Sequence, residues 1–426
     1  MKRIILLCGC LLAGFSAKAQ LTLDACRELA RAHYPEIRQY DLIRRTAEYT
    51  VSNARRAYLP QFGFSAQATW QSAVTTYPAV LTDMLAQQGV EIPGLNKDQY
   101  KLQLELNQTI WDGGKARADR QVAEAEAAES RHSVDVDLYD LDGRIDGLYF
   151  GILLFDERIA QTELTMELLQ SNLEKVRALQ QNGVAMPADS DAVEAELLTV
   201  GQQLAQAEAT RESYCRMLSI FIGRDMTGEK LVRPEVAEPL SRESDRPELA
   251  LFDARIEKFA AQERQVKAST RPRFGIFAQG YYGYPGLDFM EGMLGSDWSW
   301  NAVIGVRMSW NFGGYYTRKN SLDKLKISQR QVEVQRDIFL FNSNLQVVEE
   351  NGEIARLRKA LADDDRIVML RRSVREAAES KLRNGIIDTN DLLQKITDEA
   401  AAAMARSARE IELIQAIYEL KHTINR

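Results

Sequence analysis

The sequence contains one long pattern twice, and this duplication limits the possible folds more than any other feature. Each copy opens with a β-like segment that ends in a turn with two consecutive glycines, Gly113-Gly114 in the first copy and Gly313-Gly314 in the second. A polar run of about seventy residues follows in each copy and breaks at an Asn-Gly pair, Asn182-Gly183 or Asn384-Gly385. Because the match keeps its register over this length, the sequence predicts two internal repeats.

The polar runs argue against the two or three compact domains that 426 residues would ordinarily suggest. A helix rises about 1.5 Å per residue, so seventy residues would extend for roughly 100 Å. Small and apolar residues recur among charged ones in the first run, at Ala116, Val122, Ala123, Ala127, Val134 and Leu138. Small residues let helices approach closely. We therefore predict long antiparallel, coiled-coil-like helices that turn back at the two Asn-Gly pairs.

The first residues have the features of a secretory signal. Lys2 and Arg3 precede an apolar run, and Ala17-Lys18-Ala19 supplies the small residues of a cleavage site. The sequence therefore predicts a signal peptide over residues 1–19. Leu7-Cys8-Gly9-Cys10 loosely resembles a lipidation signal, so a lipidated N-terminus is the alternative.

Charge and residue types argue against several function classes. The net charge is −7 and acids and bases are interspersed, which does not resemble a basic nucleic-acid footprint. His33, His132 and His422 are scattered, and the two cysteines beyond the signal, Cys26 and Cys215, do not form a metal motif. No nucleophile elbow, phosphate loop or acid pair stands out. We therefore expect no nucleic acid partner, no cofactor, no metal and no enzyme activity.

Four segments alternate between apolar and polar residues, which is the pattern of strands with one apolar face. They span about 62–77, 99–111, 273–285 and 299–312. Beyond the signal, no segment has about 18 consecutive apolar residues, so no transmembrane helix is expected. Strands of this length suit a barrel that spans a bilayer, and the alternative is a soluble sandwich with one wet face. Because four strands cannot close a barrel and open edges are not tolerated in lipid, the chain would have to share a barrel. A dimer with eight strands and a trimer with twelve both satisfy this requirement.

Aromatic residues cluster near the ends of these segments, as in the interfacial girdles of membrane barrels. The girdle candidates are Trp70, Tyr77, Tyr100, Trp111, Tyr282, Trp300 and Trp310.

Shorter helical segments precede each pair of strands. The first runs from Leu21 to about Tyr58, is interrupted at Pro35 and ends at Pro60. The second runs from 246 to about 270. The predicted organisation is a first repeat over 20–222, a connector over 223–245 and a second repeat over 246–426.

The ordered set of motifs resembles the TolC family of outer-membrane channel proteins. Each motif is weak by itself, but their order covers nearly all of the chain beyond the signal. The matching segments are Tyr58-Leu59-Pro60, Trp111-Asp112-Gly113-Gly114-Lys115, Arg246-Pro247-Glu248-Leu249, Trp310-Asn311-Phe312-Gly313-Gly314, Leu382-Arg383-Asn384-Gly385-Ile386-Ile387-Asp388 and Asp391-Leu392-Leu393.

The resemblance implies a mixed α and β fold in a homotrimer. Each protomer would give four strands to a shared 12-stranded transmembrane β-barrel in outer-membrane lipid, and its long antiparallel helices to a periplasmic α-barrel. The implied function is the exit duct of a tripartite efflux pump or a type I secretion system. Such a passive channel opens through contact with a periplasmic adaptor (membrane fusion) protein and an inner-membrane transporter. The alternative is a periplasmic adaptor or another structural α-hairpin protein, although adaptors usually carry one hairpin and this chain has two.

The resemblance also implies roles for the two hairpin turns. The implied adaptor contacts are Gly183, Val184, Ala185, Gly385, Ile386 and Ile387. The implied gate candidates are Asp189, Asp191, Glu194, Arg383, Asp388 and Asp391. A ring of such carboxylates would favour cations. A plainer interpretation of Asp189 and Asp391 is that each caps the start of a helix. Met186-Pro187 stands where the family more often has Ser or Thr, which leaves the shape of the first turn open.

Overall fold

The computed structural model describes residues 21–92, 94–183, 185–226, 228–235, 244–384 and 386–425. The predicted signal peptide and residues 236–243 of the predicted connector lie outside this part of the chain. Two compact units make up the fold, one from 1–39, 133–250 and 336–426, and the other from 40–132 and 251–335. Helices α4 (Lys115–Gln181) and α8 (Gly314–Arg383) contribute residues to both units.

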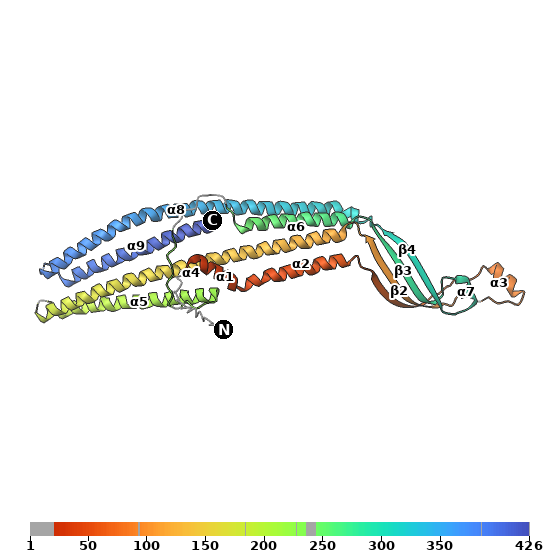
Figure 1. The fold of residues 1–426 in the computed structure, drawn as a ribbon, viewed down its shortest axis with the longest axis horizontal. Helices are drawn as coiled ribbons and strands as arrows, with labels where there is room; N and C mark the ends of the chain where they lie inside the picture. Colours follow the sequence, from red (N-terminus) through yellow and green to blue (C-terminus); the bar gives the residue numbers. More distant parts are fainter. Residues whose placement is uncertain are drawn as a thin grey trace, which may run out of the picture. The chain divides into compact units, whose positions relative to one another are not determined.

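The second unit contains a four-stranded antiparallel sheet in the order β1-β2-β3-β4 (Figure 1). The strands are β1 (Gln61–Trp70), β2 (Asp98–Trp111), β3 (Arg273–Tyr284) and β4 (Ser299–Ser309). This result confirms the mixed fold with four alternating strands.

Two strands end earlier than the alternation predicted. β1 ends at Trp70, which pairs with Asp98, the first residue of β2, so the strand stops where its partner begins. The loop between them contains a short helix, α3 (Ala79–Ala86), and a second short helix, α7 (Phe289–Leu294), lies between β3 and β4. β4 ends at Ser309 rather than near 312.

Helices of the second unit pack through small residues and polar pairs. The longer helical segments of this unit are α2 (Gln39–Arg56), α6 (Pro247–Ser269) and the first parts of α4 and α8. Val122 and Ala125 of α4 form a buried cluster with Ala261 of α6. Glu129 of α4 pairs with Lys258 of α6 at 2.6 Å. Small side chains at the contact bring the two helices close together, as predicted for the polar runs.

The first unit contains α1 (Leu23–His33), a 3-10 helix at Pro35–Arg38 and two long helical hairpins. The break at Pro35 agrees with the absence of an amide donor in proline. One hairpin joins α4 to α5 (Pro187–Ile222), and the other joins α8 to α9 (Thr389–Ile424). A cluster near the hairpin turns draws buried side chains from all four helices, namely Leu169, Val200, Ala378, Leu392, Leu393 and Ile396. Among the described residues, no helix has the combination of length and apolar character that crossing a membrane requires.

Candidate functional site

One face of the sheet is apolar across all four strands and exposed. The register places Phe62, Leu106, Ala278 and Ile304 side by side in one row. Phe62 is 72% exposed and Ile304 is 79% exposed. Other large apolar side chains exposed on the strands are Phe64, Leu102, Leu104, Ile276, Trp300, Val306 and Met308. A contiguous apolar surface of this kind marks a site that meets lipid or another protein.

The opposite face of the sheet is mainly polar. Glu105 on β2 accepts a hydrogen bond from the Gln279 amide on β3 at 3.2 Å. In the next row the register aligns Ser65, Gln103, Tyr281 and Asn301. The Lys101 ammonium lies 4.2 Å from the centre of the Tyr281 ring. This face therefore suits water, whereas the other suits an apolar surrounding.

Both outer strands pair on one side only within the described part of the chain. β1 pairs with β2, and β4 pairs with β3, so the sheet is open. An exposed strand edge presents unpaired backbone donors and acceptors, which readily recruit another strand. In lipid such an edge has no water to satisfy it. The sheet is thus incomplete by itself if its apolar face meets a bilayer.

Six of the girdle candidates lie at the two ends of the sheet. At one end, Tyr282 lies 4.9 Å from Trp300 between ring centres, and Trp70 pairs with Asp98 in the neighbouring strand. Tyr100 stacks on Trp298 at 5.8 Å.

The other end of the sheet has its own aromatic pairs. Trp111 lies 5.8 Å from Phe274, and Trp310 lies 4.6 Å from Phe312. Tyr77 differs from the other six because it lies in the loop after β1 and not on the sheet. Its hydroxyl donates to the Met290 carbonyl at 3.3 Å, and its ring packs on a buried cluster that includes Tyr284.

The junction between β2 and α4 is fixed by Asp112. One carboxylate oxygen accepts hydrogen bonds from the Tyr58 hydroxyl at 2.6 Å and from the Gly114 amide at 2.8 Å. The same oxygen accepts from the Lys115 amide at 3.1 Å, and the other accepts from the Ala116 amide at 2.6 Å. Burial raises the pKa of Asp112, but these hydrogen bonds outweigh burial and hold the pKa below its usual value. The carboxylate thus satisfies the free amides at the start of α4.

The turn of the first hairpin is closed by backbone geometry and by Asp189. Gly183 has a φ of 73°, in the left-handed region that suits glycine. α5 begins at Pro187, and Asp189 accepts a hydrogen bond from the Met186 amide at 2.7 Å. Asp189 therefore acts from the third helical position and is not the cap. Ala185 packs partly buried on a cluster of α4 and α5, whereas Val184 lies outside the described residues.

The turn of the second hairpin is closed by Asp388. Its carboxylate accepts a hydrogen bond from the Asp391 amide at 2.8 Å, so Asp388 caps α9. The interpretation of Asp391 as the cap is wrong, because α9 begins at Thr389 and places Asp391 inside the first turn. Ile386 is 68% exposed. Ile387 packs on the cluster shared by the two hairpins, and Gly385 lies outside the described residues.

The gate candidates fall into two groups by their contacts. Glu194 pairs with Arg177 at 2.7 Å, and the Asp189 and Asp388 carboxylates bind backbone amides. Asp191, Arg383 and Asp391 are exposed, and within the described ranges their charged groups have no hydrogen bond or ion pair. The resemblance implies that Arg383 would pair with one of the acidic gate candidates, and no such ion pair is formed within this part of the protomer.

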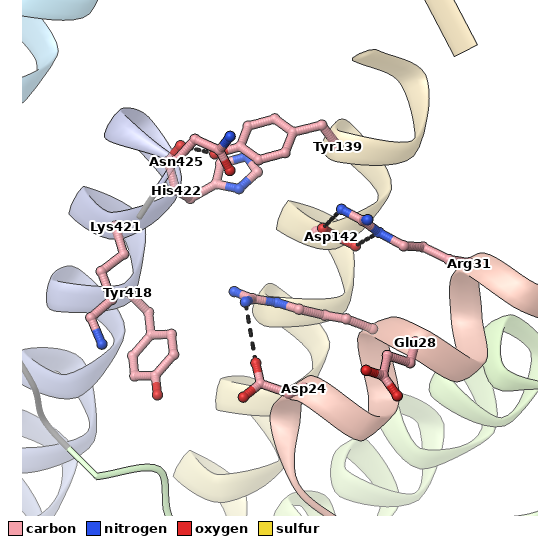
Figure 2. Close-up of a pocket in the computed structure, with 10 residues that line it drawn as sticks. Asp24, Glu28, Arg31, Tyr139, Asp142, Tyr418, Lys421, His422 and Asn425 are labelled. Carbon is pink, nitrogen blue, oxygen red and sulfur yellow. Dashed lines mark hydrogen bonds and ion pairs between the residues drawn. The ribbon is translucent and has the colours of Figure 1, made fainter. Parts of the chain in front are cut away.

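A polar cavity of about 380 Å³ lies where α1 meets α4 and α9 (Figure 2). Arg31 of α1 donates to Asp142 of α4 at 2.9 Å, and Arg27 donates to Asp146 at 2.7 Å and 2.5 Å. His422 of α9 stacks on Tyr139 with 4.2 Å between ring centres, and burial lowers the pKa of His422.

The guanidinium groups of Arg27 and Arg31 each bind one carboxylate through two hydrogen bonds. This bidentate geometry fixes the orientation of the paired side chains. We therefore interpret these pairs as a cross-link between helices. The sequence does not reveal this cross-link, because its paired residues are 111 to 119 positions apart. In the described part of the chain, no group of three or more His, Cys, Asp or Glu side chains is placed to hold a metal ion.

Comparison with known proteins gives consistent similarities. Residues 26–223 match a protein-family model described as outer membrane efflux protein. The fold is similar to that of the outer membrane protein VceC from Vibrio cholerae, with a TM-score of 0.70, 16% identity and coverage of 94% of this chain and 95% of that one. It is also similar to the CmeC outer membrane channel of Campylobacter jejuni, with a TM-score of 0.66, 15% identity and coverage of 94% and 85%. The open state of the MtrE outer membrane channel of Neisseria gonorrhoeae gives a TM-score of 0.65, 15% identity and coverage of 94% and 88%. No curated protein matches the chain.

Proposed function

This chain belongs to the outer membrane efflux protein family, and we propose that it forms the outer-membrane exit duct of a tripartite efflux pump or a type I secretion system. The family is one of channels and not of enzymes. The observation that carries the proposal is the open sheet, which has one exposed apolar face, one polar face and two edges that are unpaired among the described residues. A passive duct needs these features and requires no chemistry from the protein.

The sheet would be completed by other copies of the same chain. If the free edge of β4 pairs with the free edge of β1 in the next protomer, every strand gains two neighbours and no edge meets lipid. The apolar face would then meet lipid and the polar face would line a water-filled lumen. Three copies give the twelve strands that the family resemblance implies, with a wider lumen than the eight strands of a dimer.

The hairpin turns would meet the periplasmic adaptor, with an inner-membrane transporter supplying the energy. Six residues were candidates for this contact, and their surroundings in one protomer differ. Ile386 is the best candidate, because it is 68% exposed and apolar. Ala185 and Ile387 pack against their own hairpins, so they would shape the turn and offer less surface to a partner.

Asp191 and Asp391 are the strongest gate candidates. Their carboxylates have no partner among the described residues, whereas the other acidic candidates are bound to amides or to Arg177. An unpartnered carboxylate repeated around a pore would attract cations and repel anions. Channel recordings should therefore show reduced cation selectivity for Asp391→Asn.

The decisive experiment is the native mass of the protein extracted from outer membranes in mild detergent. We expect three copies per particle, because a closed sheet satisfies its edges in lipid and the family resemblance implies twelve strands. A monomer that stays soluble without detergent would contradict the duct, since its apolar face would have to be covered in another way. Release in association with the inner membrane would instead favour the adaptor interpretation.

A further inference from the structure

A second cavity, of about 370 Å³, lies between the two helical hairpins of the first unit. It is separate from the polar cavity beside α1 and is close to the hairpin turns. Its walls come from three helices. The lining residues are Asn172, Lys175, Ala178 and Leu179 of α4, Asn182 in the turn after α4, Glu379, Leu382 and Arg383 of α8, and Leu392 of α9.

Asn172 is the unusual member of this lining. Its side chain is buried, with 2% of the residue exposed, yet neither its amide nitrogen nor its amide oxygen has a hydrogen-bond partner among the described residues. Asn182 lines the same cavity and shows the usual solution, because its amide donates to the Ala178 carbonyl at 2.9 Å. A buried amide without partners is costly, so each such group calls for an explanation. A ligand that both donates to and accepts from Asn172 would supply one.

The charges around the cavity favour an anion. Lys175 and Arg383 line it, and within the described part of the chain neither has an ion pair. The one acidic lining residue, Glu379, is neutralised by Arg375 at 2.6 Å. Two free cationic groups facing one paired carboxylate leave the lining net positive.

The remaining walls are apolar. Leu179, Leu382 and Leu392 line the cavity, and Leu392 belongs to the cluster that packs the two hairpins together. Pockets for small molecules typically combine apolar walls with a few polar groups that fix orientation. This cavity has both, with the polar groups on α4 and α8.

We propose that this cavity binds a small organic acid that also carries a hydroxyl group. Its carboxylate would pair with Lys175 and Arg383, and its hydroxyl would donate to the Asn172 amide oxygen. An oxygen of the ligand would accept from the Asn172 amide nitrogen. The hydrocarbon body would lie against Leu382 and Leu392. The cavity lies within one protomer, so its occupancy can be measured whether or not the chain works as a duct.

Fluorine NMR of three related probes, titrated with the full-length protein in amphipol, tests the proposal. The complete probe is 3-hydroxy-4-(trifluoromethyl)benzoate. One control probe, 4-(trifluoromethyl)benzoate, lacks the hydroxyl, and the other, 2-(trifluoromethyl)phenol, lacks the carboxylate. We expect the complete probe to bind most tightly. Loss of either polar group should weaken binding by about tenfold, as expected for hydrogen bonds that involve a charged or buried partner.

Variants assign the binding to this cavity. Arg383→Gln should weaken the two carboxylate probes by about tenfold and leave the phenol unchanged. Asn172→Leu should remove the preference for the hydroxyl, so that the complete probe binds no better than 4-(trifluoromethyl)benzoate. Arg177→Gln is the matched control, because it makes the same charge change on an exposed residue of α4 that pairs with Glu194 and does not line the cavity.

Two outcomes would overturn the proposal. The first is the absence of binding by the complete probe, in which case water alone satisfies Asn172. The second is binding that Arg383→Gln and Asn172→Leu leave unchanged, or that Arg177→Gln weakens equally. Asn172→Leu should not lower the melting temperature, because it removes a buried amide that has no partner among the described residues. A change in binding by this variant would therefore not be explained by misfolding.

Discussion

The two repeats join strand to helix at equivalent turns, but they anchor these turns differently. In the first repeat, Asp112 is buried and its carboxylate accepts four hydrogen bonds, one from Tyr58 and three from backbone amides. In the second repeat, Asn311 stands three positions before the start of α8, as Asp112 does before α4, but it is exposed and accepts one hydrogen bond, from the Gly313 amide at 3.1 Å. The duplication has therefore kept the turn but not its anchor.

The second junction has a different support. The Trp310 indole donates to the Thr270 carbonyl at 3.2 Å, which ties the end of β4 to the end of α6. An ionised carboxylate at the start of a helix interacts with free amides and with the helix dipole, whereas an amide side chain has no charge to contribute. Equivalent positions of a repeat thus differ in the stability they contribute even where the backbone is alike.

The largest difference is expected from truncating the two anchors. Asp112→Ala should lower the free energy of unfolding by about 2–3 kcal/mol, because it leaves several donors without an acceptor. Asn311→Ala should cost about 0.5 kcal/mol, because it removes one exposed hydrogen bond. Guanidinium unfolding in mild detergent, followed by circular dichroism, measures both. Equal losses would show that the two anchors are equivalent after all.

Replacing Asp112 by Asn and Asn311 by Asp should change the free energy of unfolding by smaller amounts and in opposite directions. Asp112→Asn keeps the shape but removes the charge and one acceptor oxygen, so we expect a loss of about 1–2 kcal/mol. Asn311→Asp adds a negative charge at the start of α8 and should stabilise the protein by about 0.3–1 kcal/mol. The same unfolding titration checks both. A stabilising Asp112→Asn would mean that burial of the charge outweighs its hydrogen bonds.

The effect of Asp112 should also depend on pH. Its pKa is held below the usual value in the folded protein, so the carboxylate stabilises the fold above the unfolded-state pKa of about 3.9. This contribution is lost as the pH falls through the folded-state pKa. The stability difference between the wild type and Asp112→Asn should therefore be full near pH 7 and should shrink below about pH 4. A difference that is constant from pH 7 to pH 3 would contradict the assigned role.

The smallest changes in stability are expected at the two hairpin turns. Asp388→Ala removes a helix cap and should cost about 1 kcal/mol, and Asp189→Ala should cost about the same or less. Asp391→Ala should change stability by less than about 0.5 kcal/mol, because its carboxylate has no partner in the described part of the chain. Melting curves in detergent would rank the three variants. A large loss for Asp391→Ala in the assembled protein would point to a partner in another protomer.

Much of this fold could be predicted from the sequence because its signals are local. Alternation with a period of two over about ten residues identified all four strands and their two faces, and the Asn-Gly pairs located both hairpin turns. The end of β1 could not be predicted, because it is set by the start of β2. The helix α3 was missed, although Val80, Leu81, Met84 and Leu85 have helical spacing, because the prolines and glycines on either side of it indicated a loop.

The sites were less predictable because they depend on contacts between distant elements. Asp388 and Asp391 both follow the second turn, and only the first residue of α9 decides which one is the cap. Asn172 stands in a polar run where nothing marks it as buried. Its burial depends on how distant helices pack around α4, and one sequence cannot provide that information.

The sheet described above also has a consequence for the order in which the chain folds. β2 pairs with β3, and Glu105 and Gln279, which meet across this pairing, are 174 positions apart in the sequence. Contacts of such long range form late, because a long loop must close before they contribute. We therefore expect the β1–β2 hairpin to remain unpaired along β2, with its apolar face uncovered, until nearly two thirds of the chain has been synthesised. A chain that ends before β3 should leave the β1 and β2 amides open to hydrogen exchange. Aggregation during secretion would then depend on the delay between the two halves more than on the stability of the finished protein.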